Sequence, residues 1–189
     1  MNRTEIETTL RKDLKVQSVT ELADCPFENY AEIQALHKRG ELAIGCAMNE
    51  NVVDLFGTSG QRIMDKILLA SPVLAIIASI ICAIVRSQYV LLWGVALSLL
   101  ALVMTANAIM KSGRGIGGTI LLVVVAGFIY FWIQGDFAKT FLLGAYWIPN
   151  FLLTVSKEQN RMVMTDATMS SELVFIYYYL RGEIIVSKR

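Results

Sequence analysis

The middle of the chain carries four long runs of apolar residues that are separated by short polar stretches. The runs cover residues 67–85, 89–110, 116–133 and 139–155, and no charged residue lies well inside any of them. A bilayer core about 30 Å thick needs roughly 20 apolar residues of helix, so each run is long enough, or nearly so, to cross it. The runs do not alternate between apolar and polar positions, as the strands of a transmembrane β-barrel would. The pattern therefore predicts an all-α integral membrane protein with four transmembrane helices.

The fourth run differs from the others because Pro149 and Asn150 lie near its middle. Proline has no backbone N–H to donate, so we expect the helix to kink or break at this point. A re-entrant segment, which enters the membrane and leaves on the same side, is the alternative to a full crossing.

Polar segments flank the four runs. Residues 1–66 predict a cytoplasmic arm of short helices, among them 41–48 and 50–56, with an amphipathic lead-in helix that runs into the first span. The arm is too small to bury its apolar side chains alone, so we expect it to pack on the membrane face, on the tail or on a partner subunit.

Residues 156–189 predict a cytoplasmic, amphipathic tail. Its residues 172–186 favour a helix, because Ser170 or Ser171 can cap the start and Gly182 can end it. A strand is the alternative, because valine, phenylalanine, isoleucine and three consecutive tyrosines in this stretch favour strands.

Composition and charge agree with a membrane protein. Only 17% of the residues are charged and 55% are hydrophobic, whereas a soluble domain has about 25% charged residues. Basic residues near the span ends collect on one side of the predicted topology, which marks that side as cytoplasmic. They are Arg62, Lys66, Lys111, Arg114, Lys157 and Arg161, against Arg86 and Lys139 on the other side. We expect a multi-pass protein of a bacterial-type inner membrane with both termini cytoplasmic.

Gly113, Gly115 and Gly118 have the spacing of a dinucleotide-binding fingerprint. That motif requires a preceding strand, and here a membrane helix precedes it, so we expect a tight cytoplasmic turn and no nucleotide. Gly113 and Gly117 also form a pair of small residues that could support a helix contact. We expect lipid headgroups to contact four basic residues beside the spans, namely Arg62, Lys66, Lys111 and Arg114.

Few side chains could carry chemistry. The chain has one histidine, His37, and three cysteines without a C-x-x-C spacing, so we expect no catalytic residue, no metal site and no cofactor. Asn107 and Asn150 are the amides of the spans, and we expect them to join neighbouring helices or, alternatively, to line a pore. The arm is net acidic, which argues against nucleic-acid binding.

These features predict a non-catalytic subunit that anchors and scaffolds a multi-subunit envelope complex of the secretion, conjugation or defence type. Its expected partners are the lipid bilayer and other membrane subunits, in a homo- or hetero-oligomer. The alternative is a homo-oligomeric channel or pore-forming effector that the cytoplasmic arm gates. A membrane enzyme would need a polar reaction centre that the spans lack.

Overall fold

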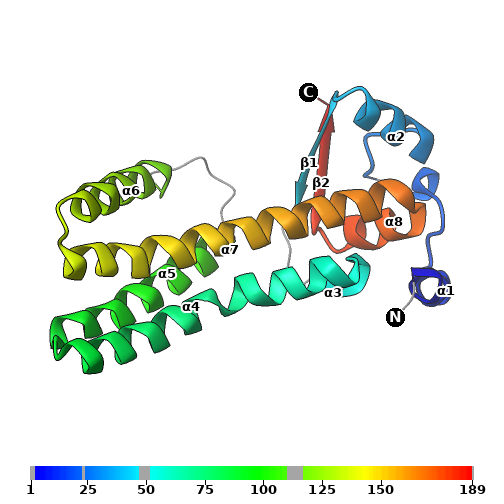
Figure 1. The fold of residues 1–189 in the computed structure, drawn as a ribbon. Coiled ribbons are helices and arrows are strands. Elements are labelled where there is room, and N and C mark those ends of the chain that lie inside the picture. The colour runs from blue at the N-terminus through cyan, green and yellow to red at the C-terminus, as the bar shows by residue number, and fades with distance from the viewer. Residues whose placement is uncertain (1–2, 23, 47–51, 110–116, 189) are drawn as a thin grey trace. The chain divides into compact units, whose positions relative to one another are not determined.

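The computed structural model describes residues 3–22, 24–46, 52–109 and 117–188 and is mostly helical in these ranges. Eight α-helices, two short 3-10 helices and one two-stranded sheet make up the described part (Figure 1). The predominance of helix agrees with the expected helical content, and the sheet departs from an all-α fold. The chain divides into two compact units, one formed by residues 1–62 and 158–189 and the other by residues 63–157.

The first unit combines elements from both ends of the chain. In chain order they are α1 (Arg3–Asp13), the 3-10 helix η1 (Val19–Glu21), α2 (Tyr30–Lys38), β1 (Leu42–Cys46), α3 (Val52–Phe56), the last part of α7 (Phe137–Ser170), α8 (Glu172–Leu180) and β2 (Ile184–Lys188).

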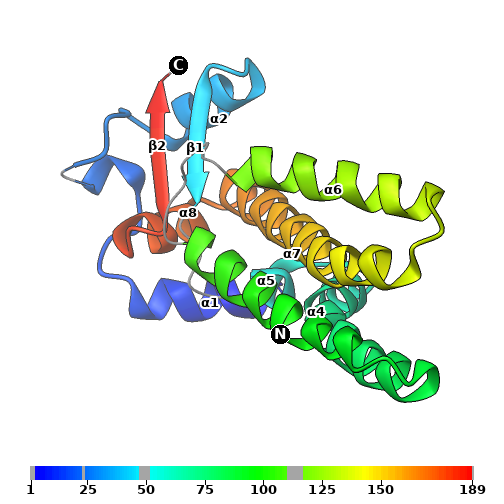
Figure 2. The same cartoon turned by 90° about the vertical axis from the view of Figure 1, so that its left-hand side faces the viewer.

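The sheet corrects one expectation and resolves another. β1 and β2 lie side by side and antiparallel, with Leu42 opposite Lys188 and Cys46 opposite Ile184 (Figure 2). The expected helix over 41–48 is therefore wrong, because Leu42–Cys46 pairs as a strand with Ile184–Lys188 near the other end of the chain. The tail contains both expected alternatives in succession, since α8 ends at Leu180 and β2 begins at Ile184 after Gly182, which has a φ of +67°.

The core of the first unit is built jointly by the arm and the tail. Ile33, Val53, Val174 and Phe175 are fully buried in one apolar cluster together with side chains of α1, α3 and α7. Of the three packing partners expected for the arm, the tail is the one observed. A small segment that could not bury enough surface alone thereby gains a core.

Polar contacts also hold the two chain ends together. The Glu172 carboxylate accepts a hydrogen bond from the Val19 backbone N–H at 2.8 Å. The Lys188 ammonium lies 2.9 Å from the Glu32 carboxylate. The arm thus binds both the beginning and the end of the tail.

The second unit contains the apolar helices. They are α4 (Ser59–Arg86), the 3-10 helix η2 (Tyr89–Leu92) leading into α5 (Trp93–Ile109), α6 (Gly117–Ile133) and the first part of α7. Within the described ranges, α4 is the one helix with both the length and the composition to cross a membrane, and Tyr89–Leu100 and Val123–Ile133 are shorter apolar helices.

α7 differs from the expected fourth span. It runs without a break through Pro149 and continues to Ser170, well beyond the expected end at residue 155. The expected break at the proline is therefore wrong. A contact with α5, described below, accounts for the carbonyl group that the proline leaves without its usual donor.

Candidate functional site

The residues singled out for helix packing lie at separate places. Asn107 is in α5, in a stretch whose side chains lie outside the described part of the structure. Gly117 is the first residue of α6, and Gly113 falls outside the described residues. The Asn150 amide donates to the Tyr146 carbonyl of its own helix at 3.3 Å. These residues do not form one site.

The residues expected to contact headgroups are also dispersed. Arg62 and Lys66 lie on α4, whereas Lys111 and Arg114 fall outside the described residues. The Arg62 guanidinium donates to the Leu55 carbonyl at 3.4 Å, and Lys66 is exposed. Arg62 therefore helps to hold the end of α3, a role that its position beside a span did not suggest.

Pro149 takes part in a contact between α5 and α7. The missing N–H of Pro149 leaves the carbonyl of Ala145, four residues earlier, without its helical donor. The fully buried Ser98 hydroxyl lies 3.1 Å from that carbonyl and 2.7 Å from the Gly94 carbonyl of its own helix. The one hydroxyl proton of Ser98 is shared between these two carbonyls, so Ser98 gives the Ala145 carbonyl a partial substitute for the missing N–H within the unbroken helix.

A close approach between α4 and α5 depends on Gly94. A Cβ at this position would lie 3.1 Å from Ser79 Cβ, and nearer still to Ser79 Oγ. Ser79 is fully buried, and its hydroxyl donates to the Ala75 carbonyl at 2.8 Å. Gly94 and Ser98 are four residues apart, which is the spacing of small residues typical of close helix contacts. That spacing could have identified the pair from the sequence.

A buried acid links α4 with α7. Asp65 is 1% exposed and accepts a hydrogen bond of 2.5 Å from the Ser156 hydroxyl. The buried face of α4 includes residues at intervals of three, Asp65, Leu68 and Ser71. The Asp65 side chain therefore lies on the same face of the helix as the other two. This buried hydrogen bond helps to hold the two helices together.

The second unit contains an apolar groove between α4, α6 and α7, with a volume of about 660 Å³. Small residues line it on two sides, Ala75 and Ala78 on α4 and Gly144 on α7. The Phe128 and Trp132 rings of α6 form the third side and stack at 6.1 Å. Pockets of about 300–1,000 Å³ with apolar walls commonly hold small molecules and cofactors.

The groove has a cation at one end. The Arg86 guanidinium carbon lies 4.4 Å from the centre of the Phe137 ring, which lines the groove. Arg86 forms no ion pair with the residues that the structure describes, whereas nearby Lys139 is paired with Asp136 at 2.9 Å. A cation beside an apolar hollow is an arrangement that could hold an amphipathic ligand.

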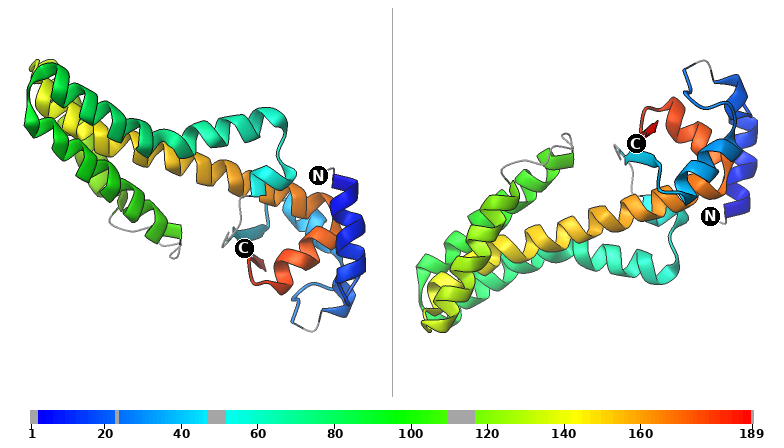
Figure 3. Two further views of the ribbon diagram at one scale, coloured as in Figure 1. Left: turned by 90° about the horizontal axis from the view of Figure 1, so that it is seen from below. Right: turned by 90° about the horizontal axis from the view of Figure 1, so that it is seen from above.

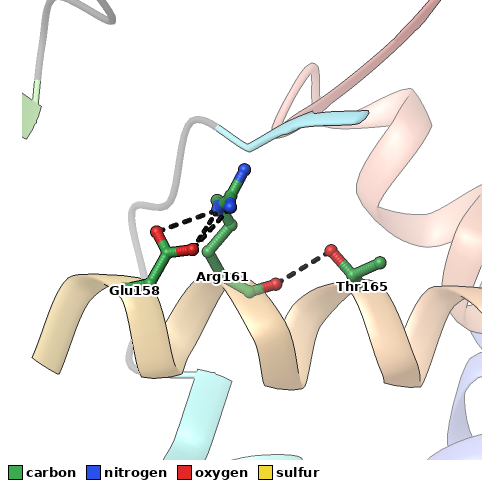
Figure 4. A network of polar contacts seen from close by, with 3 residues as sticks. All are labelled: Glu158, Arg161 and Thr165. Atoms are coloured by element: carbon green, nitrogen blue, oxygen red, sulfur yellow. Dashed lines mark hydrogen bonds and ion pairs between the residues drawn. The ribbon is translucent and has the colours of Figure 1, made fainter. Parts of the chain in front are cut away.

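The first unit has a polar network on α7 that is formed by Glu158, Arg161 and Thr165 (Figure 4). The Glu158 carboxylate accepts from the Arg161 guanidinium at 2.5–3.2 Å, and the Thr165 hydroxyl donates to the Arg161 carbonyl at 2.9 Å. Burial raises the pKa of the Cys46 thiol, and the nearby Arg161 charge only partly offsets this effect. A thiol held protonated is a poor nucleophile.

In the described ranges, no group of three or more histidine, cysteine, aspartate or glutamate side chains lies close enough together to hold a metal ion. Comparison with protein-family models, with curated proteins and with solved structures finds no match for this chain.

Proposed function

We propose that this chain is a multi-pass membrane protein that anchors and scaffolds a multi-subunit complex of a bacterial-type inner membrane. The observation that carries the proposal is that large apolar side chains are mostly buried in the first unit and often exposed in the second. Among its described residues, the first unit buries or half-buries its large apolar side chains, apart from Met162, Leu180 and Ile185. The second exposes many, among them Ile84 at 72%, Val85 at 75% and Ile133 at 78%. Exposed apolar surface of this extent suits lipid better than water.

The joining of the two chain ends supports an even number of crossings. β1 pairs with β2, and Glu172 and Lys188 bind residues of the arm. Two segments that share one core must lie on the same side of a membrane. With α4 as one crossing, at least one more is needed, and the four expected spans meet this requirement.

A scaffolding role is favoured over catalysis by what the polar groups do. Ser98 and Asp65 hold apolar helices to their neighbours, and Glu172 holds the arm to the tail. Each of these buried or half-buried polar groups is used for assembly of the chain. A folded unit made from both chain ends then presents a compact surface to neighbouring subunits at the membrane.

Cysteine labelling in intact cells tests the topology. In a variant without the three native cysteines, we expect Gln88→Cys and Gln134→Cys, in the turns after α4 and α6, to react with a membrane-impermeant maleimide. We expect Lys38→Cys and Ser187→Cys, which are matched exposed positions in the first unit, to react only after permeabilisation. Labelling of all four positions from outside, or a protein that is soluble without detergent, would contradict the proposal.

Native mass spectrometry after extraction in mild detergent tests the scaffolding role. We expect a hetero-complex with a fixed ratio of subunits. A closed homo-oligomer that conducts ions in liposomes would refute the scaffold and support the channel alternative.

A further inference from the structure

We propose that the groove between α4, α6 and α7 binds one phospholipid with an anionic headgroup, whose acyl chain lies along the groove while its phosphate contacts Arg86. The inference rests on the membrane location proposed above and adds a specific ligand to it. Three features carry it: the length and walls of the groove, the cation at its end, and the aromatic residues around that end.

The length of the groove suits an acyl chain. Its wall on α7 extends from Phe137 to Leu152, and these fifteen helical steps rise about 22 Å. One leaflet contributes half of a hydrocarbon core of about 30 Å. An acyl chain can therefore lie lengthwise in the groove within its own leaflet.

The walls are predominantly apolar, which suits an extended hydrocarbon chain, although Ser71 also lines them and its buried hydroxyl has no hydrogen-bond partner among the described residues. Ala75 and Ala78 leave space on α4, and Gly144 leaves space on α7, where a Cβ would come within 3.2 Å of the Phe128 ring. Thr140, a polar residue of the wall, donates its hydroxyl to the Asp136 carbonyl at 2.8 Å and so makes no demand on a ligand.

The charge at the end of the groove selects the headgroup. Arg86 is exposed, rests on the Phe137 ring and has no carboxylate partner among the described residues. Lys139 near the same end is already paired with Asp136. The end therefore carries one cation whose charge is not balanced, and a planar guanidinium is well suited to bind a phosphate through two hydrogen bonds.

Aromatic residues place this end at headgroup depth. The turns from α4 to α5 and from α6 to α7 lie at the same end of the second unit (Figure 3). Tyr89, Trp93 and Trp132 near these turns are 81%, 67% and 69% exposed. Exposed tryptophan and tyrosine are typical of the membrane interface, which is where a lipid phosphate lies.

Fluorescence of Trp132 provides a direct readout, because this side chain lines the groove. The other two tryptophans are removed as Trp93→Phe and Trp147→Phe, and the full-length protein is reconstituted with phosphatidylglycerol or phosphatidylcholine that carries brominated acyl chains. We expect brominated phosphatidylglycerol to quench Trp132 at lower mole fractions than phosphatidylcholine does, by roughly fivefold, as the charge of one arginine near the surface implies. Native mass spectrometry should detect one retained phosphatidylglycerol per chain.

Two variants with matched controls separate the headgroup from the acyl chain. Arg86→Gln should abolish the preference for phosphatidylglycerol, whereas Lys139→Gln should preserve it. Ala78→Phe, and the milder Ala78→Leu, should fill the groove and remove the retained lipid. Ile77→Phe is the matched control, because it adds a ring at the preceding position, which is exposed and outside the groove. This variant should leave lipid binding unchanged.

Equal quenching by the two lipids, or lipid retention that Ala78→Phe does not alter, would overturn the proposal. A wild-type dimer that Ala78→Phe converts into a monomer would also overturn it, because a second copy would then fill the groove. Membrane flotation of the same variants separates the two proposals. A wild-type protein that floats with membranes but shows no preference for phosphatidylglycerol refutes the groove site alone, whereas failure of the wild type to float refutes the membrane function as well.

Discussion

Replacement of Gly94 by alanine tests the packing between α4 and α5. The added Cβ would lie 3.1 Å from Ser79 Cβ and 3.4 Å from Phe141 Cε1, and it would overlap Ser79 Oγ. Ser79 cannot rotate away without cost, because it is fully buried and its hydroxyl donates to the Ala75 carbonyl. The two helices must therefore separate or Ser79 must lose its hydrogen bond.

The magnitude follows from two opposed contributions. Overpacking of a buried contact costs about 1–3 kcal/mol, and alanine is favoured over glycine within a helix by up to about 1 kcal/mol. We expect Gly94→Ala to lower the free energy of unfolding by about 1–2 kcal/mol. Titration with SDS, followed by circular dichroism of the protein in mild detergent, measures this change.

A second substitution identifies the cause. Ser79→Gly removes the atoms that the new methyl group meets, so the double variant should be more stable than the sum of the two single effects predicts. Gly60→Ala is a matched control on α4, because a Cβ at Gly60 meets nothing within 4 Å. A neutral Gly94→Ala variant, or additive effects in the double variant, would refute the packing argument.

Two further predictions concern single polar contacts. Ser98→Ala should lower the free energy of unfolding by about 1 kcal/mol, because the Ala145 carbonyl then has no side-chain donor. Adding Pro149→Ala to this variant should recover part of the loss, because alanine restores the helical N–H. SDS titration measures the free energy of unfolding of both variants. The hydrogen bond from Lys188 holds the pKa of Glu32 below its ordinary value of 4.5, so this pair stabilises the fold above that pH and the effect is lost as the pH falls through the lower pKa of the folded state. Acid unfolding of a Lys188→Met variant should show a shallower loss of stability below pH 4.5 than wild type, and identical curves would refute the assignment.

The helices of the middle region could be predicted because their signal is local. Apolar runs at 67–85 and 89–110 have their counterparts in α4 and in η2 with α5. Such runs report a property of each segment, its preference for an apolar medium, that does not depend on distant residues. The expected break at Pro149 was wrong, because a missing N–H within one helix does not reveal whether a neighbouring helix offers a donor to the carbonyl that it leaves open.

The residues of the groove could not be chosen from the sequence. Ala75, Ala78 and Gly144 are ordinary members of apolar runs, and nothing local distinguishes them from their neighbours. Arg86 stood out only as one of two basic residues on the less basic side. Its place over the Phe137 ring depends on the juxtaposition of α4 and α7, which the residue pattern of neither helix encodes.

By itself, the sequence determined that the middle of this protein is helical and apolar and that its ends are polar. Only the tertiary structure decided that Leu42–Cys46 is a strand, because its partner, Ile184–Lys188, lies at the other end of the chain. It also decided which small residues meet, as Gly94 meets Ser79, and which hydroxyl binds the carbonyl that Pro149 leaves open. The physical reason is that burial preference belongs to a segment, whereas strand pairing, close packing and hydrogen-bond partners belong to two segments that folding brings together.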